Sequence, residues 1–75
     1  MKIDVKCFAT LAKFQPEVSD GYEAKDGATI AELIDVLGID PAEVKIIFLN
    51  GKHSAPEVVI APGDRVGLFP AVGGG

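Results

Sequence analysis

The chain has 75 residues, enough for one small domain and too few for two. A domain of this size buries only about 60% of the surface that its unfolded form exposes, which argues against an enzyme with a deep pocket of its own. The single Cys7 and the single histidine exclude an internal disulfide framework and a zinc cluster. A hydrophobic content of 48% is too high for disorder, and a net charge of -4 argues against general nucleic-acid binding.

Charge is distributed unevenly along the chain. Residues 17–43 contain eight acidic residues and one lysine, a charge of -7, whereas the remainder carries +3. We therefore expect an acidic side and a mildly basic side on the folded domain, one of which complements a partner surface. The alternative is an ordinary solvated helix face.

No segment resembles a signal peptide or a membrane span. Residues 1–6 alternate polar and apolar side chains, whereas a signal peptide has a continuous apolar run. The longest apolar run, residues 46–49, is far shorter than the roughly 20 residues that span a bilayer. We expect a soluble, cytoplasmic protein that does not act at a membrane.

The first third of the chain predicts two strands. Residues 3–7 alternate in the period of two that is typical of a half-buried strand. Residues 9–15 are ambiguous and could form a helical turn that Pro16 ends. Residues 18–24 predict a second strand with a turn or bulge at residues 20–21, whose inward side chains would be Val18, Tyr22 and Ala24.

The next segment predicts an amphipathic helix. Thr29 is a good N-cap, and Glu32 three residues later completes a capping box. Gly38 is the expected residue for a left-handed helix end. The apolar stripe between them is formed by Ile30, Leu33, Ile34 and Leu37.

The second half of the chain predicts short strands joined by tight turns. Residues 40–43 have the start signal of one short helical turn, and residues 46–49 form a strand-like run. Asn50 and Gly51 are the strongest short hairpin signal. Residues 57–60 are apolar enough to pack, residues 61–64 form a turn, and residues 65–69 form the last strand, which Pro70 ends.

This order of elements predicts an α+β architecture in which one main helix lies across a mixed sheet of about four to five strands. The small β-grasp fold is the natural candidate, and in it the first and last strands are parallel neighbours. The domain then covers residues 1–70, and residues 71–75 form a flexible tail that leaves the centre of the sheet.

The tail ends in three glycines, which have too much backbone freedom to stabilise the fold. It is therefore either an idle spacer or the working part of the protein. A C-terminal carboxylate can be activated by ATP as an acyl-adenylate in the narrow active-site channel of an activating enzyme. Gly74 and Gly75 carry no side chain that would block entry or hinder attack on the carboxylate.

Several segments together match one known pattern. The first strand at residues 3–9, the helix start at residues 29–33 and the hairpin at residues 48–51 agree with it. The most specific segments are residues 62–66, Pro-Gly-Asp-Arg-Val, and residues 68–75, Leu-Phe-Pro-Ala-Val-Gly-Gly-Gly. Through these segments nearly the whole chain resembles the MoaD/ThiS sulfur-carrier family, the small ubiquitin-like proteins of molybdopterin and thiamin biosynthesis.

Within that family the C-terminal segment is most similar to the small subunit of molybdopterin synthase, which has a proline pair that the thiamin branch lacks. Ala71 stands where the second proline is usual, so we expect a looser exit of the tail.

The resemblance implies a carrier rather than an enzyme. An E1-like enzyme of the MoeB/ThiF type would adenylate Gly75 with ATP-Mg, and a sulfur donor would convert the adenylate to a thiocarboxylate. The carrier would then insert its tail into the large molybdopterin synthase subunit, of the MoaE type. There it would give sulfur to a pterin precursor for the dithiolene that binds molybdenum or tungsten. No cofactor or metal is expected on the carrier itself.

The expected site residues follow from this resemblance. Gly75 supplies the reactive carboxylate, and Gly74 keeps the approach to it open. The docking surface is expected on the exposed sheet face and near the root of the tail, with partner contacts from Phe69, Pro70, Val72 and Gly73.

Three further residues are interpreted as structural. Cys7 could relay a persulfide, but its phase in the strand favours a buried small hydrophobe. His53 has no partner placed by the sequence and is expected on the surface, and Gly67 inside the last strand implies that something approaches the backbone there.

Alternative functions stay open. The carrier could serve thiamin synthesis or another thiolation pathway, or it could be a ubiquitin-like modifier that forms an isopeptide bond with a lysine. From a different class, it could be a β-grasp interaction module with an idle tail.

Overall fold

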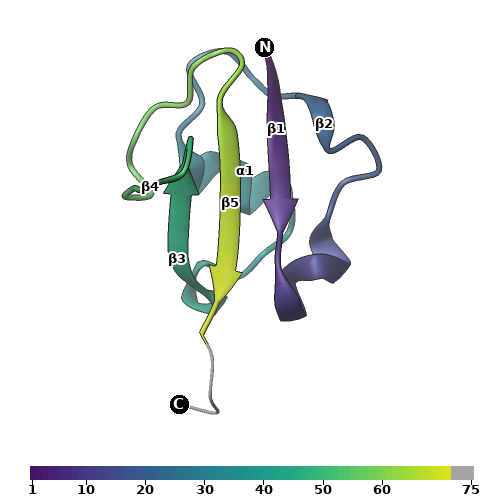
Figure 1. Ribbon diagram of the computed structural model, residues 1–75, viewed down its shortest axis with the longest axis vertical. Helices are drawn as coiled ribbons and strands as arrows, with labels where there is room; N and C mark the ends of the chain where they lie inside the picture. The colour runs from purple at the N-terminus through teal and green to yellow at the C-terminus, as the bar shows by residue number, and fades with distance from the viewer. Residues whose placement is uncertain (72–75) are drawn as a thin grey trace.

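The computed structural model describes residues 1–71, which form one α-helix, two short 3-10 helices and a five-stranded sheet (Figure 1). The elements in chain order are β1 (Lys2–Cys7), η1 (Ala9–Phe14), β2 (Asp20–Glu23), α1 (Ile30–Val36), η2 (Pro41–Glu43), β3 (Val44–Leu49), β4 (Lys52–His53) and β5 (Arg65–Pro70). The ambiguous segment after β1 is a 3-10 helix.

The sheet has the strand order β2-β1-β5-β3-β4, so the last strand lies at its centre. β5 runs parallel to β1 and antiparallel to β3, which confirms the predicted neighbours. Figure 1 shows the consequence: the last described residues lie at the lower end of β5, between β1 and β3. The β-grasp prediction is confirmed in its element order and in its pairing.

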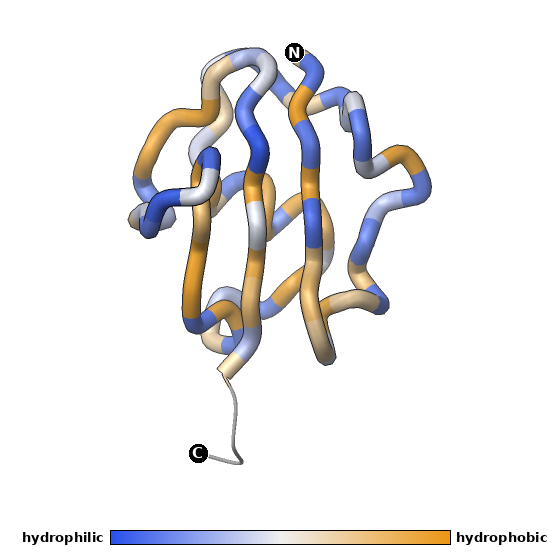
Figure 2. Tube along the Cα trace, in the orientation of Figure 1, coloured by the Kyte–Doolittle hydropathy of each residue, from blue (hydrophilic) through white to orange (hydrophobic). Residues whose placement is uncertain are grey.

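The core lies between one face of the sheet and α1. β1 alternates hydrophilic and hydrophobic residues along its length, and β3 is mostly hydrophobic (Figure 2). The inward side chains of β1 and β5 are almost fully buried, because α1 covers them with its apolar stripe. The buried cluster comprises Ile3, Val5, Cys7, Leu11, Ile30, Leu33, Ile34, Ile39, Ile47, Ile60, Val66 and Leu68.

α1 begins and ends where the sequence predicts. The Glu32 N–H donates to the Thr29 side chain, and the Thr29 N–H donates to the Glu32 carboxylate at 3.0 Å, which completes the capping box. The hydrogen bonds that the Thr29 N–H and hydroxyl donate to this carboxylate lower the pKa of Glu32. Gly38 has a φ of 82°, the left-handed conformation expected after the helix.

The second strand is shorter than predicted. Val18 was expected to face inward but is 61% exposed, because β2 begins only at Asp20. A bulge interrupts the pairing with β1, and the Asp4 carboxylate accepts a hydrogen bond from the N–H of Gly21 at this point. Beyond the bulge, Tyr22 and Ala24 pack against the core as predicted.

The side chain of Gln15 extends the pairing of β1 where no strand is present. Its Oε1 accepts a hydrogen bond from the Cys7 N–H, and its Nε2 donates to the Val5 carbonyl, both at 2.6 Å. The amide side chain thus makes the two hydrogen bonds to β1 that the backbone of a neighbouring strand would otherwise make. The spacing of the sequence gives no sign of this contact.

The loop before β5 packs through one residue only. Val58 and Val59 are 36% and 59% exposed, whereas Ile60 is 2% exposed. The prediction that the apolar run 57–60 packs is therefore confirmed for Ile60 and not for Val58 and Val59, because the segment crosses the surface and turns a single apolar side chain inward. Pro70, which was expected to end the last strand, is its final paired residue, opposite Val44.

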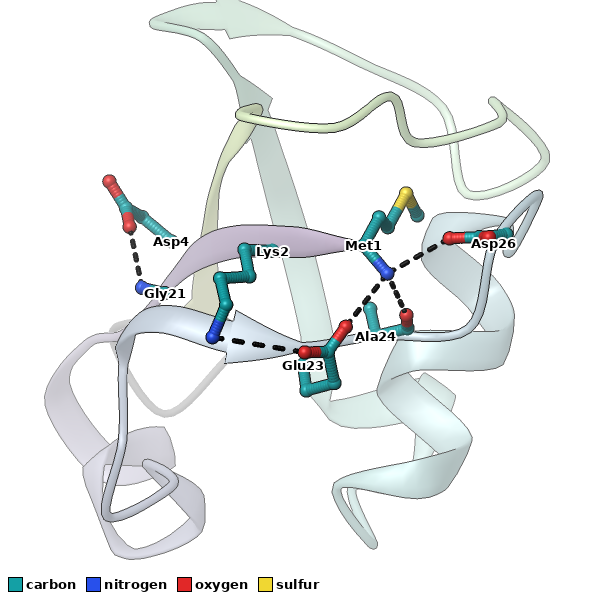
Figure 3. Close-up of polar contacts among 7 residues, drawn as sticks. All are labelled: Met1, Lys2, Asp4, Gly21, Glu23, Ala24 and Asp26. Carbon is teal, nitrogen blue, oxygen red and sulfur yellow. Dashed lines mark hydrogen bonds and ion pairs between the residues drawn. The ribbon is translucent and has the colours of Figure 1, made fainter.

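The ammonium group of Met1 ties the start of β1 to the loop that follows β2 (Figure 3). It donates to the carboxylates of Glu23 and Asp26, both at 2.9 Å, and to the carbonyl of Ala24 at 2.8 Å. These partners, Glu23 first, raise the pKa of the amine. The hydrogen bonds between Met1 and Ala24 extend the pairing of β1 with β2 by one residue beyond Lys2 and Glu23.

Candidate functional site

The root of the predicted tail lies at the end of the central strand. Pro70 is buried opposite Val44, and the exposed Ala71 follows it. The predicted partner contacts Val72 and Gly73 and the predicted reactive residues Gly74 and Gly75 lie outside the described residues. Their roles therefore stay predictions, while the structure places the point from which residue 72 continues.

An aromatic patch covers the outer sheet face beside this root; we define it as Phe8, Ile46, Phe48, His53 and Phe69. The rings of Phe8 and Phe69 stack with centroids 4.3 Å apart and an interplanar angle of 3°. Phe48 meets Phe69 edge to face at 5.4 Å and His53 at 4.7 Å. The sequence predicted Phe69 as a contact residue but did not bring the other rings together with it.

The aromatic patch arises from strand alternation on three strands. Val66, Leu68 and Pro70 face the core from β5, so Phe69 must face the opposite side. On β3 the same argument places Phe48 outside, since Ile47 is buried. Phe8 continues the pairing of β1, with its N–H bonded to the Leu68 carbonyl at 3.0 Å.

Gly67 lies beneath the rings of the patch. A Cβ added to it would lie 3.5 Å from Cε2 of Phe8, 3.6 Å from Cε1 of Phe69 and 3.7 Å from Cβ of Phe48. These are ordinary contact distances, so a methyl group would fit. What approaches the backbone at Gly67 is therefore the protein's own aromatic side chains.

Basic residues border the aromatic patch. A shallow hollow of ≈ 430 Å³ on this face is lined by Lys6 and Arg65 together with three of the phenylalanines and Gly67. Lys52, on β4 beside His53, is also exposed. The acidic segment 17–43 includes α1, which covers the other face of the sheet, and the edge strand β2, whose Glu23 lies 3.8 Å from the Nζ of Lys2. The division into an acidic and a basic side therefore stays a prediction.

Cys7 is buried in the core and is 8% exposed. Burial raises the pKa of its thiol, which disfavours the thiolate that a persulfide relay needs. His53 is exposed, as predicted. Within residues 1–71, no group of three or more His, Cys, Asp or Glu side chains is placed to hold a metal ion.

Comparison with family models matches residues 5–75 to the ThiS family. The chain belongs to the ThiS family. Among solved structures it is similar to SAMP1 from Haloferax volcanii, with 26% sequence identity, a TM-score of 0.70 and coverage of 100% of both chains. Comparison with curated protein sequences gives no match.

Membership of the ThiS family makes the chain a ubiquitin-like sulfur carrier. Such carriers are generally not catalytic and generally work with E1-like activating enzymes. Over the described part of the chain, no helix is long and apolar enough to cross a membrane.

Proposed function

We propose that this ThiS-family carrier delivers sulfur for molybdopterin synthesis through a thiocarboxylate on Gly75. The observation that carries this proposal is the C-terminal segment. Residues 68–75 have the pattern of the molybdopterin-synthase small subunit, and residues 68–70 are the end of the central strand beside the aromatic patch. The ThiS family match supports the carrier role. The pattern around Pro70 supports the choice of pathway.

The proposed chemistry takes place at one carbon atom. A carboxylate oxygen of Gly75 attacks the α-phosphorus of ATP, and pyrophosphate leaves. A sulfide equivalent from the sulfur donor then attacks the carbonyl carbon, AMP leaves, and a thiocarboxylate remains. On the large synthase subunit, the sulfur passes to the pterin precursor and water regenerates the carboxylate. All catalytic groups in this sequence belong to the partners.

The aromatic patch is proposed as the docking surface for these partners. Phe8 and Ile46 are 39% and 36% exposed, and the half-buried rings of Phe48 and Phe69 lie beside them, so the apolar side chains form one contiguous surface. Its neighbours Lys6 and Arg65 favour a partner surface that carries carboxylates around an apolar centre. Because the patch lies next to the tail root, a partner that receives the tail covers it at the same time.

Intact-mass measurement tests the carrier chemistry. The chain is incubated with an E1-like enzyme, ATP-Mg and a sulfur donor, and its mass is expected to rise by the difference between sulfur and oxygen, at Gly75. A variant without Gly74 and Gly75 serves as the control. Equal masses before and after incubation in both proteins would contradict the carrier proposal, and a covalent adduct with a lysine would favour the modifier role.

A second measurement tests the pathway and the docking surface. The thiocarboxylate form is supplied in parallel to the large molybdopterin synthase subunit with its pterin precursor and to a thiazole synthase. Sulfur transfer is expected only in the first reaction. Lys6→Glu should slow that transfer by about tenfold, whereas Lys25→Glu, on the opposite face, should leave it unchanged. Transfer to the thiazole synthase alone would overturn the choice of pathway.

A further inference from the structure

A second surface lies at the edge of the sheet, on the face opposite to the aromatic patch. A groove of ≈ 200 Å³ runs between β2 and α1, and we call it the β2–α1 groove. Its wall is mostly apolar and includes Val36, which is 71% exposed. The side chains that form this wall are Tyr22, Ala24, Ala28, Leu33 and Val36.

Backbone groups beside the groove face outward. The Met1 ammonium donates to the Ala24 carbonyl and the Ala24 N–H to the Met1 carbonyl, both at 2.8 Å, so these two residues are a hydrogen-bonded pair. The next pair, Lys2 and Glu23, is therefore a non-bonded one. In agreement, the Lys2 carbonyl accepts from Gly63 on the far side of β1.

It follows that the N–H and C=O of Glu23 point away from β1. β2 is the edge strand of the sheet, so these groups face the open side next to the groove. An exposed edge of this kind can pair with the backbone of another chain. An apolar groove beside it can then accept alternate side chains of the added strand.

The surroundings of the groove are acidic. Glu23, Glu32 and Lys25 line it, which leaves one acidic charge in excess, and the segment 17–43 that forms both of its walls carries a charge of -7 in total. Lys25 is the single basic residue in that segment. A basic partner is favoured here, in contrast to the acidic partner expected at the aromatic patch.

We propose that the β2–α1 groove binds a short extended peptide segment of a partner protein, with apolar residues at alternate positions and lysine or arginine beside them. The segment adds to β2 along residues 22–25, and one of its apolar side chains lies against Leu33 and Val36. The bulge at Gly21 limits the pairing to a few residues, so the interaction is weak and reversible. The groove and the aromatic patch lie on different faces, so the segment can bind while a sulfur-transfer partner holds the tail.

Amide chemical shifts of the full chain test the proposal. The probe is a synthetic peptide, blocked at both ends, in which valine alternates with threonine between pairs of lysines. Titration should move the resonances of residues 22–25 and 33–36 and leave Phe48 unchanged, with a dissociation constant between about 10 μM and 1 mM. No shifts up to about 1 mM, or shifts confined to the aromatic patch, would overturn it.

Matched variants and peptides separate the contributions of the apolar wall, of the basic residues of the peptide and of the backbone pairing to the binding. Val36→Ser should weaken binding about tenfold, whereas Val18→Ser, at a similarly exposed valine outside the groove, should not change it. A peptide with glutamates in place of the lysines, and one N-methylated at alternate amides, should each bind at least tenfold more weakly. Equal binding by all three peptides would exclude strand addition. Thiocarboxylate formation by Val36→Ser should equal that of the unaltered chain, which keeps this test independent of the proposed carrier function.

Discussion

The Met1 ammonium is the most heavily bonded charged group among the described residues, with three acceptors from the β2 end (Figure 3). Glu23 has a lowered pKa because it accepts a hydrogen bond from this amine. The two groups form one ion pair, which is weakened at high pH when the amine loses its proton and at low pH when the carboxylate gains one.

We predict that the Glu23→Gln, Asp26→Asn double variant has a flatter dependence of Tm on pH. The folded amine has a raised pKa, so its stabilisation is complete below the ordinary value of 8.0 and is lost as pH rises through the raised pKa. Glu23 has a lowered pKa, so its contribution is complete above 4.5 and is lost as pH falls. Thermal unfolding monitored by circular dichroism measures this.

The exposed Glu57→Gln removes one carboxylate that does not contact Met1; as the control it should retain the pH dependence of the unaltered chain. If the double variant and the control have the same pH profile, the Met1 contacts do not contribute to stability.

Asn50 connects the β3–β4 turn to the start of β5. Its Oδ1 accepts from the Arg65 N–H and its Nδ2 donates to the Asp64 carboxylate, both at 2.9 Å. Asp64 in turn accepts from the Ala61 N–H at 2.8 Å, a side-chain hydrogen bond that closes the turn before the last strand. The sequence predicts each turn separately, but it does not predict the hydrogen bond that joins them.

We predict that Asn50→Ala destabilises the domain by about 2 kcal/mol. It removes the side-chain bonds and also places alanine at a φ of 54°, a left-handed conformation that alanine disfavours. Asn50→Gly removes the same bonds without the backbone strain and should cost only about 1 kcal/mol. Urea unfolding of the two variants separates the two effects, and equal losses would assign the whole cost to the hydrogen bonds.

The helix α1 depends on its N-terminal cap because it contains only seven residues. Thr29→Ala removes the acceptor for the Glu32 N–H and should cost about 1 kcal/mol, or roughly 4–8 °C in Tm. Thr29→Ser keeps the hydroxyl and should lose much less. The comparison by calorimetry would contradict the capping role if serine and alanine lowered Tm equally.

We predict that the body of the domain provides the stability of the fold, whereas the C-terminal glycines serve thiocarboxylate formation alone. The buried core cluster extends from Ile3 to Leu68, and glycines add no side chain to it. Deletion of residues 73–75 should therefore change Tm by less than about 2 °C. The same deletion should abolish thiocarboxylate formation completely.

A point substitution in the core provides the opposite control. Leu33→Ala should lower stability by about 2–5 kcal/mol, since Leu33 is 3% exposed, yet any folded fraction should still form the thiocarboxylate. A large fall in Tm on removing residues 73–75 would contradict the separation of the two tasks.

The sequence by itself determined the local elements of this protein. The capping box at Thr29, the glycine after α1, the Asn50–Gly51 turn and the alternation in β1 all rest on interactions between residues that are close in the chain. The same patterns gave the β-grasp order and placed Phe69 beside the tail root. The predicted boundaries of β2 were wrong, because a bulge and the side-chain hydrogen bonds of Gln15 replace regular strand pairing with β1 there.

Only the tertiary structure decided how surfaces are assembled. The aromatic patch needs Phe8, Phe48 and Phe69 from three strands, and these meet because the strand order places β5 between β1 and β3. The β2–α1 groove likewise combines an edge strand with a helix face. Such contacts depend on strand order and register, which are set by the burial of the whole core rather than by any local pattern.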